Sequence, residues 1–458
     1  MDPDSLSDAT ARALTHRLAV AQRDARVPSI VASAARRGEP VWFGAAGTVD
    51  GAAPTADTQY RIGSITKTMV AVCVLRLVDA GVVDLADPIG QHLPDAPAAD
   101  STVHQLLTHT AGLASETPPP WWERTSGETR PELRDVLTDD PRRHPPGRVH
   151  HYSNPGFGLL GALVAAKAGR PWFDVLRDEV LVPLGMSRTE YLPTGAHALG
   201  WAVHPWADVL LPEPIHDHGL LAAAGQLWST PGDLCRFGVF LGGDGAGLLR
   251  PETLELMRTP AVAPDDPAWS GSYGLGVQLL RFDRHVVFGH TGSMPGFLAV
   301  MMTSAEDGLT VAVQSNAWSG LALGAVLADL LGTVRDREPT MPIPWVAAET
   351  VDDDAHALIG PWYWGAEAVS LSLRADGHLE IAGIGGRGRT ARFDRTDDGR
   401  WIGRNGYYHG EFLETRRDGT GAVTHLDIGS FVFTRQPYAP AEVVPDGLDL
   451  GGWQLGHR

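Results

Sequence analysis

The spacing of Ser64 and Lys67 makes these two residues candidates for nucleophilic catalysis. The chain of 458 residues contains only two lysines, and one of them stands three positions after the serine in Arg61-Ile-Gly-Ser-Ile-Thr-Lys67. Arginine could not replace it, because a guanidinium stays protonated whereas a partly buried ammonium can lose its proton. We therefore expect Ser64 to be the nucleophile and Lys67 its base. Ser-x-x-Lys is a short motif that also occurs by chance, so this prediction needs support from other residues.

The segment that follows Ser64 has the composition of a buried helix. Residues 65–78 are apolar on nearly every side, Gly63 precedes the serine, and Gly81 stands where a helix would end. The pattern predicts a helix with Ser64 at its first turn. Residues three apart on a helix share a face, so Ser64 and Lys67 would lie side by side.

A second candidate group is Tyr152-Ser-Asn154, which precedes a helix predicted over residues 156–168. In an extended segment, residues two apart project to the same side, so the phenol and the amide would face one cleft. The plainer alternative is that Asn154 caps the following helix and Tyr152 packs beside it.

A third candidate group is His290-Thr-Gly-Ser293, on a predicted strand. Alternation along a strand aims His290 and Gly292 to one face. A glycine at that place would let a substrate backbone lie flat against the strand edge.

The remaining pattern predicts an α+β domain. Its elements are a helix and a hairpin at the start and three consecutive antiparallel strands near the end, over residues 9–25, 30–35, 40–45, 286–290, 298–303 and 309–314. A segment rich in Pro, Thr and Asp over residues 95–147 reads as loops that border a site.

Composition changes at a proline-rich stretch, which predicts a domain boundary. We expect a first domain over residues 1–336, a linker over 337–350 and a second domain over 351–458. Asp-Gly pairs punctuate short strand-like segments in the second domain, a pattern typical of a small meandering barrel.

The charge of the chain argues against nucleic acid and anionic membranes as partners. The formal net charge is -18, and no basic run reverses it locally. The first residues lack a signal-like apolar region, and no long apolar span follows, so we expect a cytoplasmic location. Cys73 and Cys235 lie in separate apolar runs and read as buried structural thiols.

Neither a metal nor a nucleotide cofactor is indicated. The sequence His216-Asp-His218 lacks a third ligand, and adjacent residues on an extended chain splay apart. The glycine-rich run over residues 383–388 lies in the predicted barrel instead of between a strand and a helix, so it reads as a turn.

The three groups together resemble the motifs of the penicillin-binding-protein and class C β-lactamase superfamily of serine hydrolases. They occur in the same order as Ser64-x-x-Lys67, Tyr152-x-Asn154 and His290-Thr-Gly292. The stretches over residues 106–113 and 184–186 are also similar to that superfamily, and the likeness covers most of residues 9–334. It implies a β-lactamase/transpeptidase-like domain, with an antiparallel sheet flanked by helices and a helical subdomain that carries Tyr152.

The resemblance also implies a role for each residue. Ser64 would attack an acyl carbon, Lys67 and Tyr152 would move the proton, and Asn154 would bind the substrate amide. The N–H groups of Ser64 and Ser293 would form the oxyanion hole, in which one donor contributes about 3 kcal/mol.

His290 departs from the strictest form of this pattern, in which a lysine holds a substrate carboxylate. Imidazole is mostly neutral at pH 7, so a fixed positive charge is not guaranteed. Esterases, D-aminopeptidases and peptide cyclases of the superfamily are similar in having His here. The residue argues against β-lactam resistance as the main activity.

Among these groups the chain most resembles the penicillin-binding-protein-type thioesterases, which are stand-alone peptide cyclases with a lipocalin-like barrel. Gly360-Pro-Trp362 and the segment over residues 431–438 carry this likeness. It implies that Ser64 takes a peptidyl chain with a D-residue at its acyl end from the carrier protein of a nonribosomal peptide synthetase. The peptide's own amine would then release it as a ring.

Some residues are candidates for substrate binding. Thr291 and Gly292 belong to the third motif, Arg435 would present a cationic fork from the barrel, and apolar walls that exclude water would come from Trp121, Trp122, Trp228 and Trp318. The alternatives are that the tryptophans pack between elements and that Arg435 is an ordinary surface residue.

Two other functions remain open on the sequence. The first is a D-amino-acid-specific peptidase or a carboxylesterase with the same catalytic residues. The second is a binding module that retains the cleft without catalysis, against which the intact motifs argue.

Overall fold

The computed structural model describes residues 6–138, 141–243, 245–262, 270–282, 285–318, 320–341 and 344–437. The chain separates into two compact units, residues 1–340 and 341–458, which we describe one at a time. The boundary falls inside the segment that the sequence marks as a linker, and the described residues 338–341 and 344–350 form no helix or strand.

The first unit is built on a seven-stranded antiparallel sheet with the order β2-β1-β11-β10-β9-β8-β7. Its strands are β1 (Ser29–Arg36), β2 (Glu39–Gly47), β7 (Gly271–Tyr273), β8 (Gln278–Phe282), β9 (His285–Met294), β10 (Phe297–Ser304) and β11 (Leu309–Ser315). The central strands β1 and β11 are buried along their whole length, because helices cover both faces of the sheet. The antiparallel order of β9, β10 and β11 confirms the three consecutive strands predicted from the sequence.

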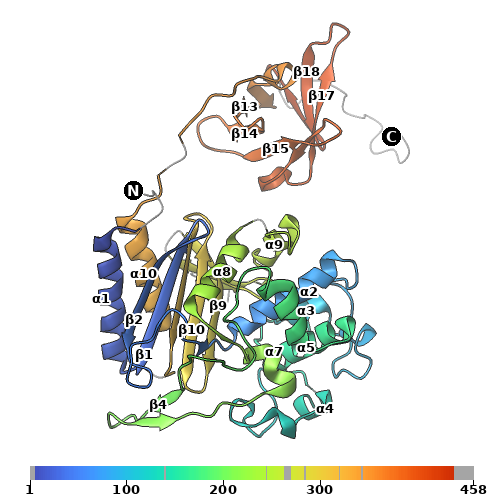
Figure 1. Ribbon diagram of the computed structural model, residues 1–458. Helices are drawn as coiled ribbons and strands as arrows, with labels where there is room; N and C mark the ends of the chain where they lie inside the picture. The colour runs from blue at the N-terminus through green and yellow to red at the C-terminus, as the bar shows by residue number, and fades with distance from the viewer. Residues whose placement is uncertain are drawn as a thin grey trace. The chain divides into compact units, whose positions relative to one another are not determined.

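Two terminal helices cover one face of this sheet. Helices α1 (Asp8–Ala25) and α10 (Leu323–Arg337) lie side by side there (Figure 1). Their apolar stripes, which include Leu14, Leu18, Leu327 and Leu330, pack on the sheet residues Val300 and Val311 in one cluster. This layer stabilises the sheet at the side away from the candidate catalytic residues.

The opposite face carries the helices that hold those residues. Helix α2 (Ile65–Asp79) is buried along almost its entire length and forms the centre of the largest apolar cluster. Around it lie α3 (Val103–Leu107), α4 (Leu133–Val136), α5 (Asn154–Ala168), α6 (Trp172–Leu176), α7 (Ala222–Gly225), α8 (Pro231–Gly242) and α9 (Pro251–Met257). Two short ladders, β3 (Tyr60–Arg61) with β6 (Trp228–Ser229) and β4 (Trp201–Val203) with β5 (Leu210–Pro212), complete the unit.

The second unit is a closed antiparallel barrel of eight strands. After the short helix α11 (Asp353–His356), the chain forms β12 (Gly360–Trp364), β13 (Glu367–Leu373), β14 (Leu379–Gly383), β15 (Ala391–Arg395), β16 (Trp401–Gly403), β17 (Phe412–Arg417), β18 (Val423–Ile428) and β19 (Phe431–Thr434). Inward-facing side chains such as Trp362, Phe393 and Phe433 fill its interior, so the barrel has a packed core. The α+β fold with a small all-β barrel is therefore confirmed.

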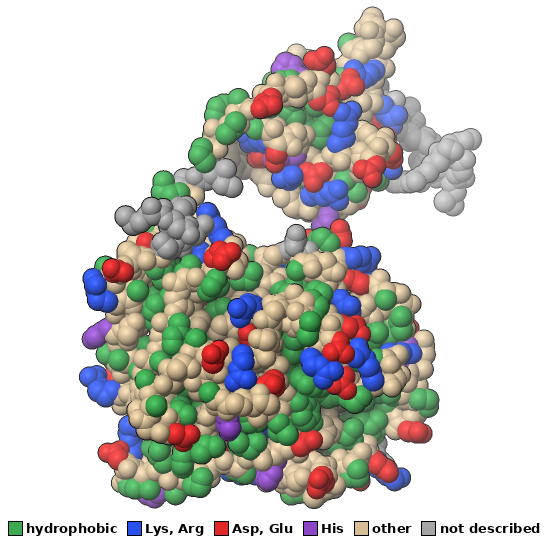
Figure 2. Space-filling view, in the orientation of Figure 1, with side chains coloured by type: hydrophobic (Ala, Val, Ile, Leu, Met, Phe, Trp, Pro, Cys, Tyr) green, Lys and Arg blue, Asp and Glu red, His purple; other side chains and the backbone are tan. Residues whose placement is uncertain are grey.

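The surface carries charges of both signs. On the face shown in Figure 2, Lys and Arg side chains are interspersed with Asp and Glu side chains. Some of the charged side chains form ion pairs, such as Arg335 with Asp307. Within the described residues, no helix has the length and apolar character that crossing a membrane requires. Cys73 and Cys235 are both buried and unpaired.

Candidate active site

Ser64 stands at the point where α2 begins. Gly63 has φ of +53°, a left-handed conformation that glycine adopts readily, and this turn directs the chain from β3 into the helix. Ser64 is half-buried, whereas the residues on both sides of it are buried. The serine is therefore the one partly exposed residue between Ile62 and Thr66.

Lys67 lies directly behind Ser64. Its side chain is fully buried, and its Nζ donates hydrogen bonds to Ser64 Oγ at 2.9 Å and to the carbonyl oxygen of Ala224 at 2.6 Å. Burial lowers the pKa of this amine to about 7, although the nearby carboxylates Glu116 and Glu123 act in the opposite direction. A substantial fraction of Lys67 is therefore unprotonated at neutral pH and can accept the proton of Ser64.

Tyr152 is the third member of this group. Its ring centroid lies 5.0 Å from Lys67 Nζ. Burial raises the pKa of the Tyr152 phenol, and the hydrogen bond with Ser64 partly offsets this effect. The phenol is consequently neutral and able to relay a proton between the serine, the amine and a leaving group.

Asn154 is the first residue of α5, but its side chain is not the helix cap. The cap is Ser153, whose Oγ accepts a hydrogen bond from the N–H of Gly156 at 3.1 Å. The Asn154 amide instead donates to Glu116 Oε1 at 2.8 Å. Glu116 Oε2 accepts a second bond from Trp122 Nε1 at 2.7 Å, so the carboxylate fixes the orientation of the Asn154 amide.

His290 lies inside the protein rather than at the cleft surface. The residue is 1% exposed; its Nε2 is 3.0 Å from Tyr273 Oη and its Nδ1 2.5 Å from the carbonyl oxygen of Thr291. Burial lowers the pKa of His290 to about 3, so the imidazole is neutral. It cannot supply the positive charge that would hold a substrate carboxylate.

Gly292 is required by a close approach between β9 and the segment before Ser64. A Cβ at Gly292 would lie 1.9 Å from the carbonyl oxygen of Ile62 and 3.1 Å from the amide nitrogen of Ser64. The expectation that glycine makes room for a substrate backbone is corrected here, because the space beside it is filled by Ile62 and Ser64. A Cβ at Gly63 would in turn lie 2.6 Å from the amide nitrogen of Ser293.

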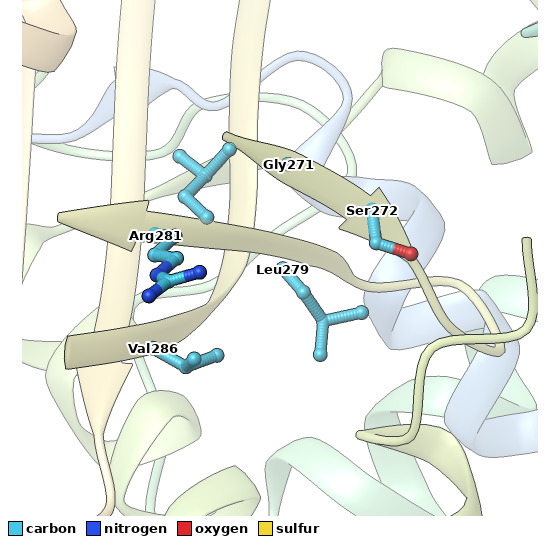
Figure 3. Close-up of a pocket in the computed structure, with 6 residues that line it drawn as sticks. Gly271, Ser272, Leu279, Arg281 and Val286 are labelled. Carbon is cyan, nitrogen blue, oxygen red and sulfur yellow. The ribbon is translucent and has the colours of Figure 1, made fainter. Parts of the chain in front are cut away.

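Thr291 points away from this contact. Its N–H and its Oγ1 both donate to Gln278 Oε1, at 3.0 and 3.1 Å. Thr291, Gln278, Tyr152, Tyr273 and neighbouring residues line a cavity of about 470 Å³. A smaller pocket next to it shares Gly271, Ser272 and Leu280; Figure 3 shows its walls on β7, β8 and the first residues of β9.

The expected role of Trp228 in lining the cleft is corrected by its burial. Its side chain is 0% exposed and packs on Phe297 and His197, because the β3 and β6 ladder pulls it into the interior. Trp122 is also buried, and its Nε1 donates a hydrogen bond to Glu116. Trp121 and Trp318 are 48% and 43% exposed, so their rings remain accessible to a ligand.

Arg435 has its contacts inside the second unit. Its guanidinium donates to the carbonyl oxygens of Ala357, Ile359 and Pro361 at 2.8, 3.0 and 3.3 Å, and stacks 3.7 Å from the ring of Trp362. These bonds join the end of β19 to the entry of β12. Substrate contact by Arg435 stays a prediction.

Several residues at the site were missed by sequence reasoning. They are Ala224, Glu116, Gln278, Tyr273 and His109. His109 and Glu116 lie in the stretch over residues 95–147, which the sequence predicts to border a site, but the sequence pattern singles out neither residue. Ala224 contributes a backbone carbonyl, which carries no sequence signal.

Nothing in the described residues assembles a metal site. No group of three or more His, Cys, Asp and Glu side chains converges there. In the segment His216-Asp-His218, Asp217 accepts a hydrogen bond from Tyr191 and His218 is buried against the ring of Trp122.

Comparison with known proteins identifies the first unit and leaves the second without an assigned role. The sequence model of the beta-lactamase family matches residues 11–333, and a domain of unknown function, DUF7586, matches residues 351–435. Among curated relatives, penicillin-binding protein 4 of Amycolatopsis lactamdurans is 27% identical over 58% of this chain and 74% of its own length.

Two solved structures extend the comparison. SurE is 25% identical with a TM-score of 0.59, over 93% of this chain and 99% of SurE. The D-amino acid amidase of Ochrobactrum anthropi, solved with D-phenylalanine, is 25% identical with a TM-score of 0.62, over 72% of this chain and 99% of the amidase.

Proposed function

The chain belongs to the beta-lactamase family, and from this premise we propose that it is a serine acyl-transfer enzyme in which Ser64 becomes acylated and Lys67 is the base. The observation that carries this proposal is the contact between the two side chains. A fully buried amine with a pKa of about 7 lies 2.9 Å from the hydroxyl oxygen that it would deprotonate.

The proposed reaction uses the groups around Ser64. Ser64 Oγ attacks the acyl carbon while its proton passes to Lys67 Nζ. The N–H groups of Ser64 and Ser293 donate hydrogen bonds to the acyl oxygen, on which negative charge develops. Tyr152 relays the proton to the departing group, which leaves an ester between the acyl chain and Ser64. Water or an amine then attacks that ester, with the proton transfers reversed.

The neutral environment of the third motif narrows the substrate class. His290 is uncharged, and no Lys or Arg is among the residues that line the neighbouring cavity, within the described part of the chain. A carboxylate beside the acyl bond would have no cation to pair with there, and its desolvation would be uncompensated. We infer that the substrate is a thioester, ester or amide whose leaving group carries no carboxylate, in contrast to a penicillin or a peptide with a terminal carboxylate.

For the physiological reaction we propose macrocyclisation of a peptidyl thioester. Ser64 would accept the chain from the carrier protein of a nonribosomal peptide synthetase, with a D-residue at the acyl end, and the terminal amine of the peptide would close the ring. This proposal is supported by the alignment with SurE across both units of the chain. SurE has also been solved with D-Leu, which favours a D-residue in the corresponding site.

A D-amino-acid-specific peptidase, or a carboxylesterase, is the second candidate. It is favoured by the alignment with the D-amino acid amidase, which matches nearly the full length of that enzyme. The amidase covers only 72% of this chain, so the barrel unit distinguishes the two candidates.

A product analysis with three substrates separates these functions. The purified chain is incubated with a peptidyl thioester that ends in a D-residue, its L-residue counterpart and D-phenylalanine amide, with Ser64→Ala as the control. We expect a cyclic peptide from the first substrate only. Hydrolysis of the amide without a cyclic product would favour the peptidase, and a fluorophosphonate that fails to label Ser64 would leave only the binding module.

A further inference from the structure

Tyr152 is held in place by one residue that is distant in sequence, His109. The N–H of His151 donates to the carbonyl oxygen of His109 at 2.8 Å, and the N–H of Ser153 donates to His109 Nδ1 at 3.0 Å. Both backbone amides that flank Tyr152 are therefore bonded to His109. The segment over residues 151–153 belongs to no helix or strand, so these two bonds take the place of a strand partner.

The His109 ring also supports the Tyr152 ring. The two ring centroids are 4.2 Å apart with an angle of 34° between the planes, which is a tilted stack. Tyr273 and Phe157 enclose the other sides of the imidazole at 4.8 and 5.2 Å, and His109 is 2% exposed. A ring confined in this way limits the positions that the Tyr152 phenol can adopt.

The backbone of His109 makes this arrangement unusual. Residue 109 follows the end of α3 with φ of +57°, the left-handed conformation that glycine usually adopts after a helix. The N–H of Thr110 donates to the carbonyl oxygen of Gln105 at 2.8 Å, which completes a Schellman motif. Glycine would fit this turn with less strain than histidine, so the retained side chain indicates a role beyond the turn.

The chemistry of the imidazole limits that role. Burial lowers the pKa of His109 well below its usual range, and the charge of Lys67 contributes in the same direction, so the ring is neutral. Because Nδ1 accepts a bond from Ser153, the proton of the neutral ring is on Nε2. His109 therefore does not exchange protons with the reacting groups.

We propose that His109 is a positioning residue that holds the Tyr152 phenol against Ser64 by bonding both flanking amides and stacking on the ring. This inference rests on the proposed acylation of Ser64. In this proposal, His109 in the stretch over residues 106–113 contributes to catalysis by positioning Tyr152, without contacting the substrate.

Two substitutions of His109 test the proposal. His109→Gly removes the side chain and relieves the left-handed backbone, so the fold should be retained. His109→Asn keeps an acceptor, Oδ1, at the place of Nδ1, and asparagine tolerates the left-handed conformation. Ala98→Gly is the matched control, because Ala98 has the same φ of +57° and is not part of the site.

The measurements are kcat and KM with a D-residue peptidyl thioester, the rate of fluorophosphonate labelling of Ser64, and the melting temperature. We expect His109→Gly to lower kcat about 10- to 100-fold with little change in KM, the range that a small misplacement of a catalytic group causes. His109→Asn should recover most of this loss, and Ala98→Gly should behave as the unsubstituted chain.

Two outcomes would overturn the positioning role. One is a His109→Gly variant whose Ser64 labelling rate and kcat equal those of the unsubstituted chain. The other is a His109→Gly variant that raises KM and leaves kcat unchanged. Failure of the unsubstituted chain to label Ser64 is a separate result, because it removes the proposed function itself and this inference with it.

Discussion

The backbone amides of Ser64 and Ser293 lie side by side because neither Gly63 nor Gly292 has a side chain. Cβ atoms at these two glycines would lie 2.6 Å from the Ser293 nitrogen and 3.1 Å from the Ser64 nitrogen. The two residues come from different elements, one at the start of α2 and the other on β9. Their contact is the point where the central helix and the sheet together form the proposed oxyanion hole.

Gly292→Ala should therefore abolish most of the activity. The added Cβ would meet the Ile62 carbonyl at 1.9 Å, so β9 and the Ser64 segment must separate and one donor moves out of reach. We expect kcat to fall about 10²- to 10³-fold, the usual effect of losing one oxyanion donor. The control is Gly332→Ala in α10, where a Cβ meets no atom within 4 Å. Full activity of Gly292→Ala would contradict the proposed oxyanion hole.

The rate of Ser64 acylation should depend on the protonation of Lys67. With a pKa of about 7, the amine takes up a proton as the pH falls below 7 and can no longer accept one from Ser64. The labelling rate should thus be constant above about pH 8 and fall toward tenfold per pH unit well below the pKa. A labelling rate that stays constant between pH 5 and pH 8 would exclude Lys67 as the base.

Lys67→Arg should be inactive although it preserves the charge. A guanidinium does not lose its proton, so Ser64 would have no base, and we expect a loss of about 10²- to 10⁴-fold in kcat. Lys167→Arg is a closely matched control, because Lys167 is the other lysine of the chain and is exposed at the end of α5. Equal losses in both variants would show that the effect is unrelated to the site.

The burial of Lys67 should also be measurable as a pH-dependent stability. Between about pH 7 and pH 10.5 the unfolded chain binds this proton and the folded chain does not, so the free energy of unfolding rises with pH. The contribution is about 1.4 kcal/mol per pH unit in this window. Denaturant unfolding of the unsubstituted chain and of Lys67→Met at pH 7 and pH 9 isolates it, because Met does not titrate. If the free energy of unfolding changes equally between pH 7 and pH 9 in both proteins, the amine is not buried as described.

The charge of Glu116 should affect the pKa of Lys67, the proposed base. Its carboxylate raises the pKa of Lys67, so Glu116→Gln should shift the acidic limb of the labelling rate to lower pH. The amide oxygen of Gln can still accept the bond from Asn154, whereas its NH2 group cannot accept the bond from Trp122, so the variant removes the charge and one hydrogen bond. Asp217→Asn is the control, because Asp217 is bonded to Tyr191 and does not contribute to the pKa of Lys67. An unchanged limb in Glu116→Gln would contradict this role.

Those features of the site that depend on local periodicity were predictable from the sequence. The contact of Ser64 with Lys67 follows from the helical spacing, and the shared face of His290 and Gly292 follows from strand alternation. Alternation does not tell which face of a strand is buried. The burial of His290 and its contact with Tyr273 were therefore not predictable.

The features that depend on tertiary contacts were not predictable. Trp228 reads as a loop tryptophan, and only the pairing of its strand with Arg61 and Tyr60 brings it into the interior. The bond from Thr291 to Gln278 joins neighbouring strands, one of which the sequence pattern did not reveal. Contacts of this kind depend on the register between elements, and a single sequence does not encode that register locally.

Substitution of Arg435 distinguishes a structural role of this residue from a role in substrate binding. The Arg435→Ala variant leaves the carbonyl oxygens of Ala357, Ile359 and Pro361 without this donor and removes the stacking on Trp362. If this bonding is its main role, the barrel should lose about 1 to 3 kcal/mol of stability, and KM for the peptidyl thioester should stay unchanged. Thermal unfolding and steady-state kinetics of the same variant check both. A raised KM with an unchanged unfolding transition would instead assign Arg435 to the substrate.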